Sequence, residues 1–278
     1  MISTLVIVFR ESLEAALIVS IVMAASRGIA GRTAYVVGGF VVGLLGAGVV
    51  AIFADAIAGL FEGSGSDLFN AAVLLAAVAM LTWHQAWMSS HGREMAASAR
   101  KLGDNVRSGA RPLSALAVVT AVAVLREGSE TVLFLYGIAA EGSSDTGSML
   151  AGGLAGMVLA VVIGWLIYSG LARISMRHIF KVTAVIITLL AAGLAAQAAA
   201  FLAQTGWLPP LGNRVWDTSW LLSQDGILGQ FLHIVVGYVA QPQGIQIVFY
   251  VLTLLLIIVA SGVARRSAEA RQSAGGTA

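Results

Sequence analysis

Two segments of the chain carry the same three charged residues within an otherwise apolar sequence. VFRESLEAALIV covers residues 8–19, and VLREGSETVLFL covers residues 124–135. In each segment an arginine is followed at once by a glutamate, and a second glutamate comes three positions after the first. On a helix, residues three or four positions apart share a face, so each segment presents two carboxylates beside one guanidinium. The residues are Arg10, Glu11 and Glu14 in the first segment and Arg126, Glu127 and Glu130 in the second.

This pattern predicts a binding site for a multivalent cation. Pairing each arginine with the glutamate four positions later leaves Glu11 and Glu127 without a counter-charge. A charged residue at the centre of a membrane costs about 2.5 to 3.5 kcal/mol, so six unpartnered ones would cost roughly 15 to 20 kcal/mol. If the two segments meet, four carboxylates and two guanidiniums form a site of net charge −2, whose oxygen ligands favour a metal cation. We expect the metal ligands to be Glu11, Glu14, Glu127 and Glu130, supported by Arg10 and Arg126.

The composition places these segments in a membrane. Hydrophobic residues make up 58% of the chain, charged residues make up 11%, and the mean hydropathy is +0.90, which is far outside the range of soluble domains. The chain has no cysteine, so a metal must bind through oxygen or imidazole ligands. The first apolar segment holds charges and lacks a small-residue cleavage site, so we expect it to be retained and not removed as a signal peptide.

The apolar segments predict an all-α polytopic membrane protein with seven transmembrane helices. Each segment is long enough to cross roughly 30 Å of hydrocarbon. They lie at residues 3–26, 35–60, 68–90, 113–139, 148–172, 179–203 and 244–263.

The positions of the lysines and arginines predict the orientation. These residues accumulate in cytoplasmic connections, and 13 of the 16 follow the first, third, fifth or last span. The N-terminus is therefore expected outside and the C-terminus in the cytoplasm. The same bias accounts for the basic run at 92–112 and is favoured over a role of this run in binding nucleic acid or lipid headgroups. Membrane lipid is an expected partner of the chain, and nucleic acid is not.

The two halves of the chain also match each other. The motif arginine recurs at an offset of 116, a GxxxG pair at 113 and an intramembrane glutamine at 112: Arg10 and Arg126, Gly39/Gly43 and Gly152/Gly156, and Gln85 and Gln197. Three spans per copy is an odd number, so the second copy enters the membrane from the opposite face. This is the inverted repeat common among secondary transporters. Small residues allow close packing, so the glycine pairs are expected to bring the charged helices together.

The repeat divides the chain into five parts. These are a first three-helix repeat (1–91), a cytoplasmic basic connection (92–112), a second, inverted three-helix repeat (113–203), an extracytoplasmic loop with an interfacial helix (204–243), and the seventh helix with its tail (244–278). Corresponding changes in the two motifs are expected to have similar effects. The two glutamines either complete the ion pathway or bridge helices by hydrogen bonds.

The paired RExxE motifs, in the first and fourth of seven spans, resemble those of the high-affinity iron permeases of fungi and the related bacterial iron permeases. LTWHQAWM in the third span, AAGLAAQAAAFLAQTGWLP around the sixth and VWDTSWLL before the seventh are also similar to bacterial members. The resemblance implies an iron importer of the bacterial cytoplasmic (inner) membrane, without enzymatic activity or an organic cofactor. It implies that the motif glutamates carry iron. It also implies a partner, an extracytoplasmic iron oxidase or iron-binding protein.

Acidic side chains dominate the predicted outer face. Such a face concentrates cations at an entrance, although each acid has an equal chance of serving only as a helix cap. The entrance candidates are Glu62, Asp67, Glu141 and Asp145.

Three histidines lie in or near the membrane. His84 and His91 are seven positions apart near the cytoplasmic end of the third span, where interfacial solvation is favoured over a role in metal transfer. His233 lies in ILGQFLHIVVGYVA, a 14-residue stretch too short to span, which predicts an interfacial or re-entrant helix. A ligand role is not expected for His233.

Several alternatives stay open at the level of sequence. Carboxylates also bind manganese or magnesium, so a carrier of another divalent metal is the nearest alternative to an iron importer. A non-transporting metal sensor would also use such a site. An intramembrane hydrolase is disfavoured because the chain has no HExxH or nucleophilic serine motif. The sequence does not determine whether the substrate is ferric or ferrous iron, or whether transport is coupled to protons or to the membrane potential.

Overall fold

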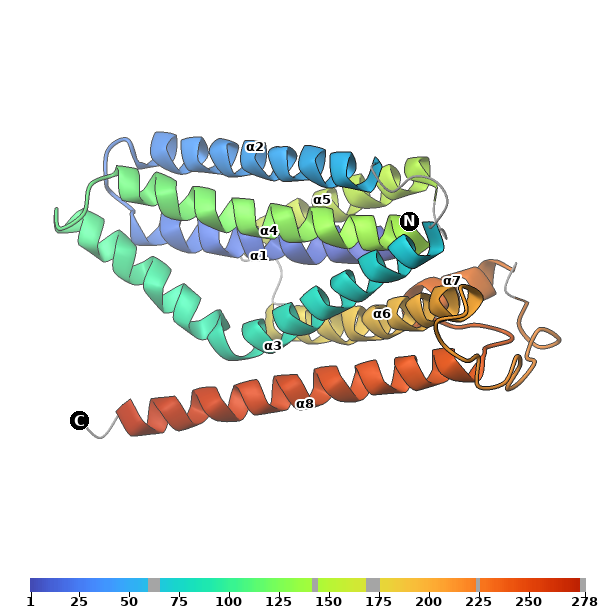
Figure 1. Cartoon of the computed structure of the whole chain (residues 1–278). Coiled ribbons are helices and arrows are strands. Elements are labelled where there is room, and N and C mark those ends of the chain that lie inside the picture. Colours follow the sequence, from blue (N-terminus) through green and yellow to red (C-terminus); the bar gives the residue numbers. More distant parts are fainter. Residues whose placement is uncertain (60–65, 142–144, 169–175, 224–225, 276–278) are drawn as a thin grey trace.

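The computed structural model describes residues 1–59, 66–141, 145–168, 176–223 and 226–275, and all regular structure within these residues is α-helical. The predicted all-α fold class is confirmed. Figure 1 shows the helices, most of them lying roughly along one common direction. They are α1 (Ile2–Ala25), α2 (Arg32–Gly59), α3 (Ser66–Arg107), α4 (Ser114–Glu141), α5 (Thr146–Tyr168), α6 (Met176–Gln204), α7 (Ile227–Val236) and α8 (Gly244–Gly275).

Five of these helices, among the described residues, are long and apolar enough to cross a membrane. The stretches are Arg32–Ile57, Asp67–Met88, Thr146–Leu166, His178–Gln204 and Gly244–Ala268. They make this an integral membrane protein. Helices α1 and α4 have the necessary length, with 24 and 28 residues, but each carries a charged RExxE motif. The count of seven spans and the inverted repeat therefore remain predictions.

The glycine pairs pack against the backbones of the two charged helices; the prediction that they bring these two helices together stays a prediction. A Cβ atom on Gly43 of α2 would lie 2.6 Å from the carbonyl oxygen of Ala121 in α4, and one on Gly156 of α5 would lie 2.5 Å from that of Leu5 in α1. Only glycine permits such a close approach of two helix backbones. Helix α2 therefore covers α4, although the two belong to different predicted repeats, and α5 covers α1 in the same way.

Helices α1 and α4 lie in the middle of the bundle and run in opposite directions (Figure 1). The main apolar core joins them to α3 and α6 through side chains without solvent exposure, among them Ile7, Leu74, Phe134 and Ile187. A second cluster closes the end at which α1 leads into α2, around Val22, Val36 and Leu116. These clusters fix the depth at which the two charged motifs lie.

Helix α3 is longer than the predicted third span, and the predicted short helix after the sixth span is present. Helix α3 continues to Arg107, so most of the predicted basic connection at 92–112 is helical, and α3 changes direction along its length (Figure 1). The short helix predicted around His233 is present as α7. It ends at Gly237, whose φ of 70° lies in the left-handed region that glycine adopts readily.

Candidate metal-binding site

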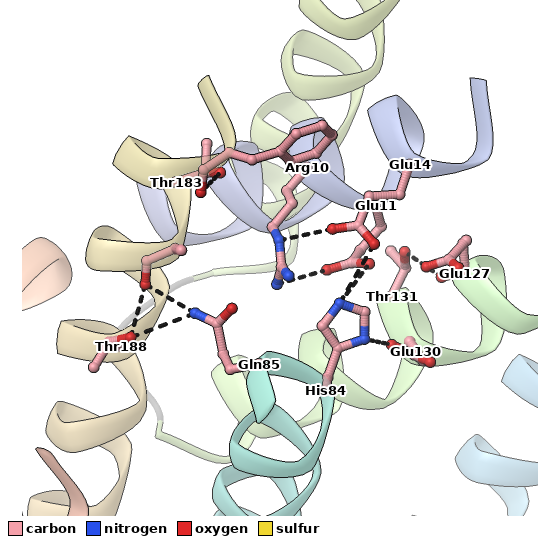
Figure 2. Close-up of polar contacts among 12 residues, drawn as sticks. Arg10, Glu11, Glu14, His84, Gln85, Glu127, Glu130, Thr131, Thr183 and Thr188 are labelled. Atoms are coloured by element: carbon pink, nitrogen blue, oxygen red, sulfur yellow. Dashed lines mark hydrogen bonds and ion pairs between the residues drawn. The ribbon is translucent and has the colours of Figure 1, made fainter. Parts of the chain in front are cut away.

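Helix α1 places the first motif in the interior of the bundle. The side chains of Arg10, Glu11 and Glu14 are no more than 4% exposed. Arg10 Nε lies 3.0 Å from Glu14 Oε1, and Arg10 Nη1 lies 3.6 Å from Glu11 Oε1 (Figure 2). The intrahelical pair expected from the spacing is present, and Glu11 shares the same guanidinium. One arginine thus faces two carboxylates, which leaves this motif with an excess negative charge.

Helix α4 places the second motif opposite the first. Arg126 Nε lies 2.9 Å from Glu130 Oε1 and 3.9 Å from Glu127 Oε1. The Arg126 guanidinium also stacks over the ring of Trp87 in α3, 4.0 Å from its centroid, a favourable cation–π contact. Glu127 is almost fully buried, whereas the side chain of Arg126 is 29% exposed.

His84 of α3 lies between the two motifs (Figure 2). Its Nε2 lies 3.5 Å from Glu14 Oε2 and 3.9 Å from Glu11 Oε2, and its Nδ1 contacts Glu130 Oε2. The side chain is 1% exposed, so the interpretation of His84 as an interfacially solvated residue is wrong. The physical reason is that α3 extends far beyond the predicted cytoplasmic end of its span, which leaves His84 deep in the bundle.

Ligand atoms from three helices converge at this point. One side-chain atom each of Glu11, His84, Glu127 and Glu130 lies within 4.8 Å of the others. Both carboxylate oxygens of Glu11 and of Glu127 are buried without a hydrogen bond among the described residues. Buried carboxylates without such bonds are unfavourable unless a cation or a proton compensates them. The cluster therefore has the composition and the geometry of a cation site.

Comparison with known proteins identifies the family of this chain. The model of the iron permease FTR1 family matches residues 1–274, nearly the whole chain. The chain belongs to the iron permease FTR1 family. It is 32% identical over 276 residues to the ferrous iron permease EfeU of Escherichia coli O157:H7, an alignment that covers 96% of this chain and 98% of that one. No solved structure matches the chain.

A second group of relatives agrees with this assignment. The ferrous iron permease EfeU of Yersinia pestis is 31% identical over 257 residues, with 90% of this chain and 89% of that one covered. The family is one of permeases, so the protein is a membrane transporter of the iron permease class and not an enzyme. The family resemblance that the two motifs indicate is confirmed.

In this iron permease the two intramembrane glutamines have different surroundings. Gln85, next to His84, donates from Nε2 to the carbonyl oxygen of Ala184 at 2.8 Å and to Thr188 Oγ1 at 3.4 Å (Figure 2). It therefore bridges α3 and α6, one of the two predicted roles. Gln197 is partly buried in α6.

Two threonines of the motif helices were missed by sequence reasoning. Thr4 and Thr120 are fully buried, and their hydroxyls have no hydrogen-bond partner among the described residues. By contrast, the hydroxyls of Thr82, Thr131 and Thr188 bond to the carbonyl four residues earlier. Each of the two missed threonines precedes its motif by the same distance, in TLVIVFRESLE and TAVAVLREGSE, and their offset of 116 equals that of the arginines. This repeated position in the sequence could have identified the two threonines as candidates.

His84 also had a signal in the sequence. It directly precedes Gln85, which the internal repeat places within a span. Adjacent residues on a helix differ in depth by only about 1.5 Å, so an intramembrane Gln85 implies an intramembrane His84.

The predicted outer acids have different local surroundings where the structure describes them. Glu62 lies outside the described residues, and Asp67 is in the first turn of α3. Asp145 Oδ2 accepts a hydrogen bond from the Ser148 backbone N–H at 3.2 Å, and bonds from Ser148 hold the pKa of Asp145 below its usual value. Asp145 is thus a helix cap, the alternative to an entrance role.

The remaining outer acid faces a histidine. Glu141, the last residue of α4, has its Oε1 3.6 Å from Nε2 of His233 in α7. The side chain of His91, the other histidine considered in the sequence, lies outside the described residues.

Proposed function

We propose that this iron permease imports iron through the site formed by Glu11, His84, Glu127 and Glu130, with Glu14 as an additional carboxylate beside His84. The observation that supports the proposal is the convergence of four ligand atoms within 4.8 Å of one another in the bundle interior. Metal–ligand distances of about 2.0 to 2.2 Å place opposite ligands roughly 4.0 to 4.4 Å apart. A small contraction of the cluster would therefore coordinate one first-row transition-metal ion.

The ligand set favours ferrous iron. Imidazole suits iron, zinc, copper and nickel, whereas magnesium and calcium prefer oxygen ligands alone. One imidazole among several carboxylates therefore favours Fe²⁺ over Mg²⁺ and Ca²⁺. The relatives from Escherichia coli and Yersinia pestis are ferrous iron permeases, which supports the same choice. Manganese import is the alternative, since carboxylates also accept Mn²⁺.

We further propose that α1 and α4 cross the membrane, which gives seven spans and an inverted repeat. In each helix the arginine partly compensates its two glutamates, which lowers the cost of burying the motif. The packing supports the repeat, because Gly43 contacts Ala121 while Gly156 contacts Leu5. Gly43 and Gly156 are 113 positions apart, and the residues they contact, Leu5 and Ala121, are 116 positions apart. The same two offsets relate the glycine pairs and the motif arginines in the sequence. The bias of lysine and arginine supports an N-terminus outside and a C-terminus in the cytoplasm.

In this topology Thr4 and Thr120 lie on opposite sides of the central site. Each precedes the arginine of its motif by six residues, about 1.7 helical turns, and α1 and α4 run in opposite directions (Figure 1). Their hydroxyls would then offer oxygen ligands to an ion that approaches the site from outside or leaves it toward the cytoplasm. An extracytoplasmic iron oxidase or iron-binding protein stays a prediction from the family resemblance.

Uptake by purified protein in liposomes tests this function. Radioactive Fe²⁺ under reducing conditions and a chelated Fe³⁺ source are supplied separately, with Mn²⁺ as competitor, and with pH and membrane potential set independently. We expect Fe²⁺ uptake to fall about 100-fold in Glu11→Gln and in Glu127→Gln, because each change removes an anionic ligand while keeping its size. Asp104→Asn, at an exposed position in α3, is the control. Uptake at the wild-type rate by a monodisperse Glu11→Gln protein would overturn the proposed site.

A further inference from the structure

A second cation-binding geometry lies where α4 ends, between Glu141 and His233. The side chains are 9% and 17% exposed, and the distance from His233 Nε2 to Glu141 Oε1 is 3.6 Å. Helix α7, which carries His233, belongs to the segment between α6 and α8, and Figure 1 shows it at the same end of the bundle as the N-terminus. The proposed topology makes this the outer end.

The His233 ring is held in one orientation by its other nitrogen. Nδ1 lies 2.8 Å from the backbone carbonyl oxygen of Tyr238, and a carbonyl oxygen only accepts hydrogen bonds. Nδ1 therefore carries a hydrogen, and in the neutral ring Nε2 presents its lone pair. Tyr238 is fixed in turn by its hydroxyl, which lies 2.6 Å from Thr218 Oγ1 and donates to the Leu222 carbonyl. Histidines that bind metals usually donate their other ring N–H to a carboxylate, a backbone carbonyl or water, and Nδ1 of His233 has such a partner.

The lone pair of Nε2 faces a carboxylate, and a proton or a metal ion between the two atoms would stabilise this contact. A proton would place the two atoms in a charge-assisted hydrogen bond of about 2.7 to 2.9 Å. The observed 3.6 Å is longer than that. Two ligands of one tetrahedral ion, each about 2.1 Å from the metal, are roughly 3.4 Å apart. The spacing therefore fits a shared metal ion better than a shared proton.

Glu141 also lies in line with the central site. It follows Glu130 by 11 residues on α4, which is about three turns and roughly 16 Å along the same face of the helix. Phe134 and Ile138 occupy that face between the two glutamates, and neither has any solvent exposure. An ion bound at Glu141 is thus separated from the central site by an apolar barrier.

From these contacts we propose that Glu141 and His233 form an outer loading site for a divalent transition-metal ion, which binds there before it reaches the central site. The loading site rests on the proposed function for its orientation and for its cargo. With only two protein ligands it would keep water in its remaining positions, as suits a site that must release its ion inward.

Metal binding to the full-length protein in detergent tests the loading site directly. Anaerobic titration with Fe²⁺ is expected to give two ions per wild-type chain, one per Glu11→Gln/Glu127→Gln chain, and none when His233→Gln is added. His178→Gln, at an exposed histidine of α6, is the matched control and should leave both ions bound. Absence of the remaining ion in the Glu11→Gln/Glu127→Gln protein would overturn the loading site.

Transport separates a metal ligand from an ion pair. In liposomes, His233→Gln and Glu141→Gln should raise the Fe²⁺ concentration for half-maximal uptake at least tenfold and change the maximal rate less than twofold. His233→Lys keeps a positive charge opposite Glu141 but removes the imidazole ligand, so it should show the same defect. Wild-type behaviour of His233→Lys would identify an ion pair and overturn the proposal. Absence of iron uptake by the wild-type protein would refute the proposed function instead, while the titration would still decide whether the site binds metal.

Discussion

The two RExxE motifs have the same spacing but different surroundings. In α1 the side chain of Arg10 is 4% exposed, and it faces two glutamates that are buried as deeply. In α4 the side chain of Arg126 is 29% exposed, that of Glu130 is 14% exposed, and the guanidinium also stacks on Trp87. The counter-charge of the first motif therefore lies in a medium of lower polarity, where an unpaired carboxylate is less tolerable. Two motifs with the same spacing need not contribute equally to the stability of the protein.

His84 is a second difference between the halves. The glutamines correspond at an offset of 112, which pairs Gln85 with Gln197 and His84 with Ala196. One imidazole thus serves both motifs, contacting Glu14 of α1 and Glu130 of α4. The four motif glutamates recur at the internal offset of 116, but His84 has no counterpart at its offset.

The largest difference between the halves is expected for the arginines. Arg10→Leu should destabilise the protein by about 3 to 5 kcal/mol, because it leaves two buried carboxylates without their counter-charge. Arg126→Leu should cost about 1 to 2 kcal/mol, since its ion pair is partly solvated and its stacking on Trp87 is modest. Thermal unfolding in detergent measures both. Equal losses of stability in the two variants would show that the burial of each arginine does not determine its contribution to stability.

The next effect concerns His84. His84→Gln keeps a polar side chain of similar size but removes the imidazole, and we expect Fe²⁺ to bind the central site up to about 100-fold more weakly, or about 2.7 kcal/mol. Because magnesium does not prefer nitrogen ligands, the ratio of Fe²⁺ to Mg²⁺ binding should fall as well. The comparison is Ala196→His, at the corresponding buried position of α6, introduced into the His84→Gln protein. We expect that it does not restore Fe²⁺ binding. An unchanged Fe²⁺ to Mg²⁺ ratio in His84→Gln would exclude imidazole as a source of selectivity.

The glycine contacts should behave alike in the two halves. Gly43→Val and Gly156→Val place a side chain against the backbones of α4 and α1, and each should lower stability by about 1 to 3 kcal/mol. Gly48→Val and Gly164→Val are controls on the same helices, where a Cβ meets nothing within 4 Å. Thermal midpoints of the four proteins are compared. Similar midpoints for the contact and control variants would argue against the close helix packing.

The smallest effect is expected for the glutamines. Gln85→Leu removes hydrogen bonds to Ala184 and Thr188, and such interhelical bonds average about 0.6 kcal/mol in membranes. Gln197→Leu should change stability less. Iron uptake by both variants is measured in parallel. Strong loss of uptake by stable Gln85→Leu protein would assign Gln85 to the ion pathway in addition to its structural bridge.

The amino-acid sequence by itself determined the solvent and the helical class, and it predicted the carboxylates of the proposed site. Apolar segments of fixed length require helices in a membrane because no water is present to satisfy the backbone. A charge within such a segment is expensive enough to indicate function, which is why Glu11, Glu14, Glu127 and Glu130 could be selected from spacing alone. The paired glycines indicated close helix packing near the charged helices, but not that α2 packs on α4 and α5 on α1.

Only the tertiary structure decided which side chains complete the site. His84 belongs to α3, which carries neither motif. It is 70 positions from Glu14 and 46 positions from Glu130 in the sequence, so no local periodicity encodes its position between them. The unequal burial of Arg10 and Arg126 likewise depends on which helices cover them, and not on the motif. The contact between Glu141 and His233 requires α7 to fold back against the bundle. Local sequence sets the chemistry of each helix face, but the packing of distant helices decides which faces meet.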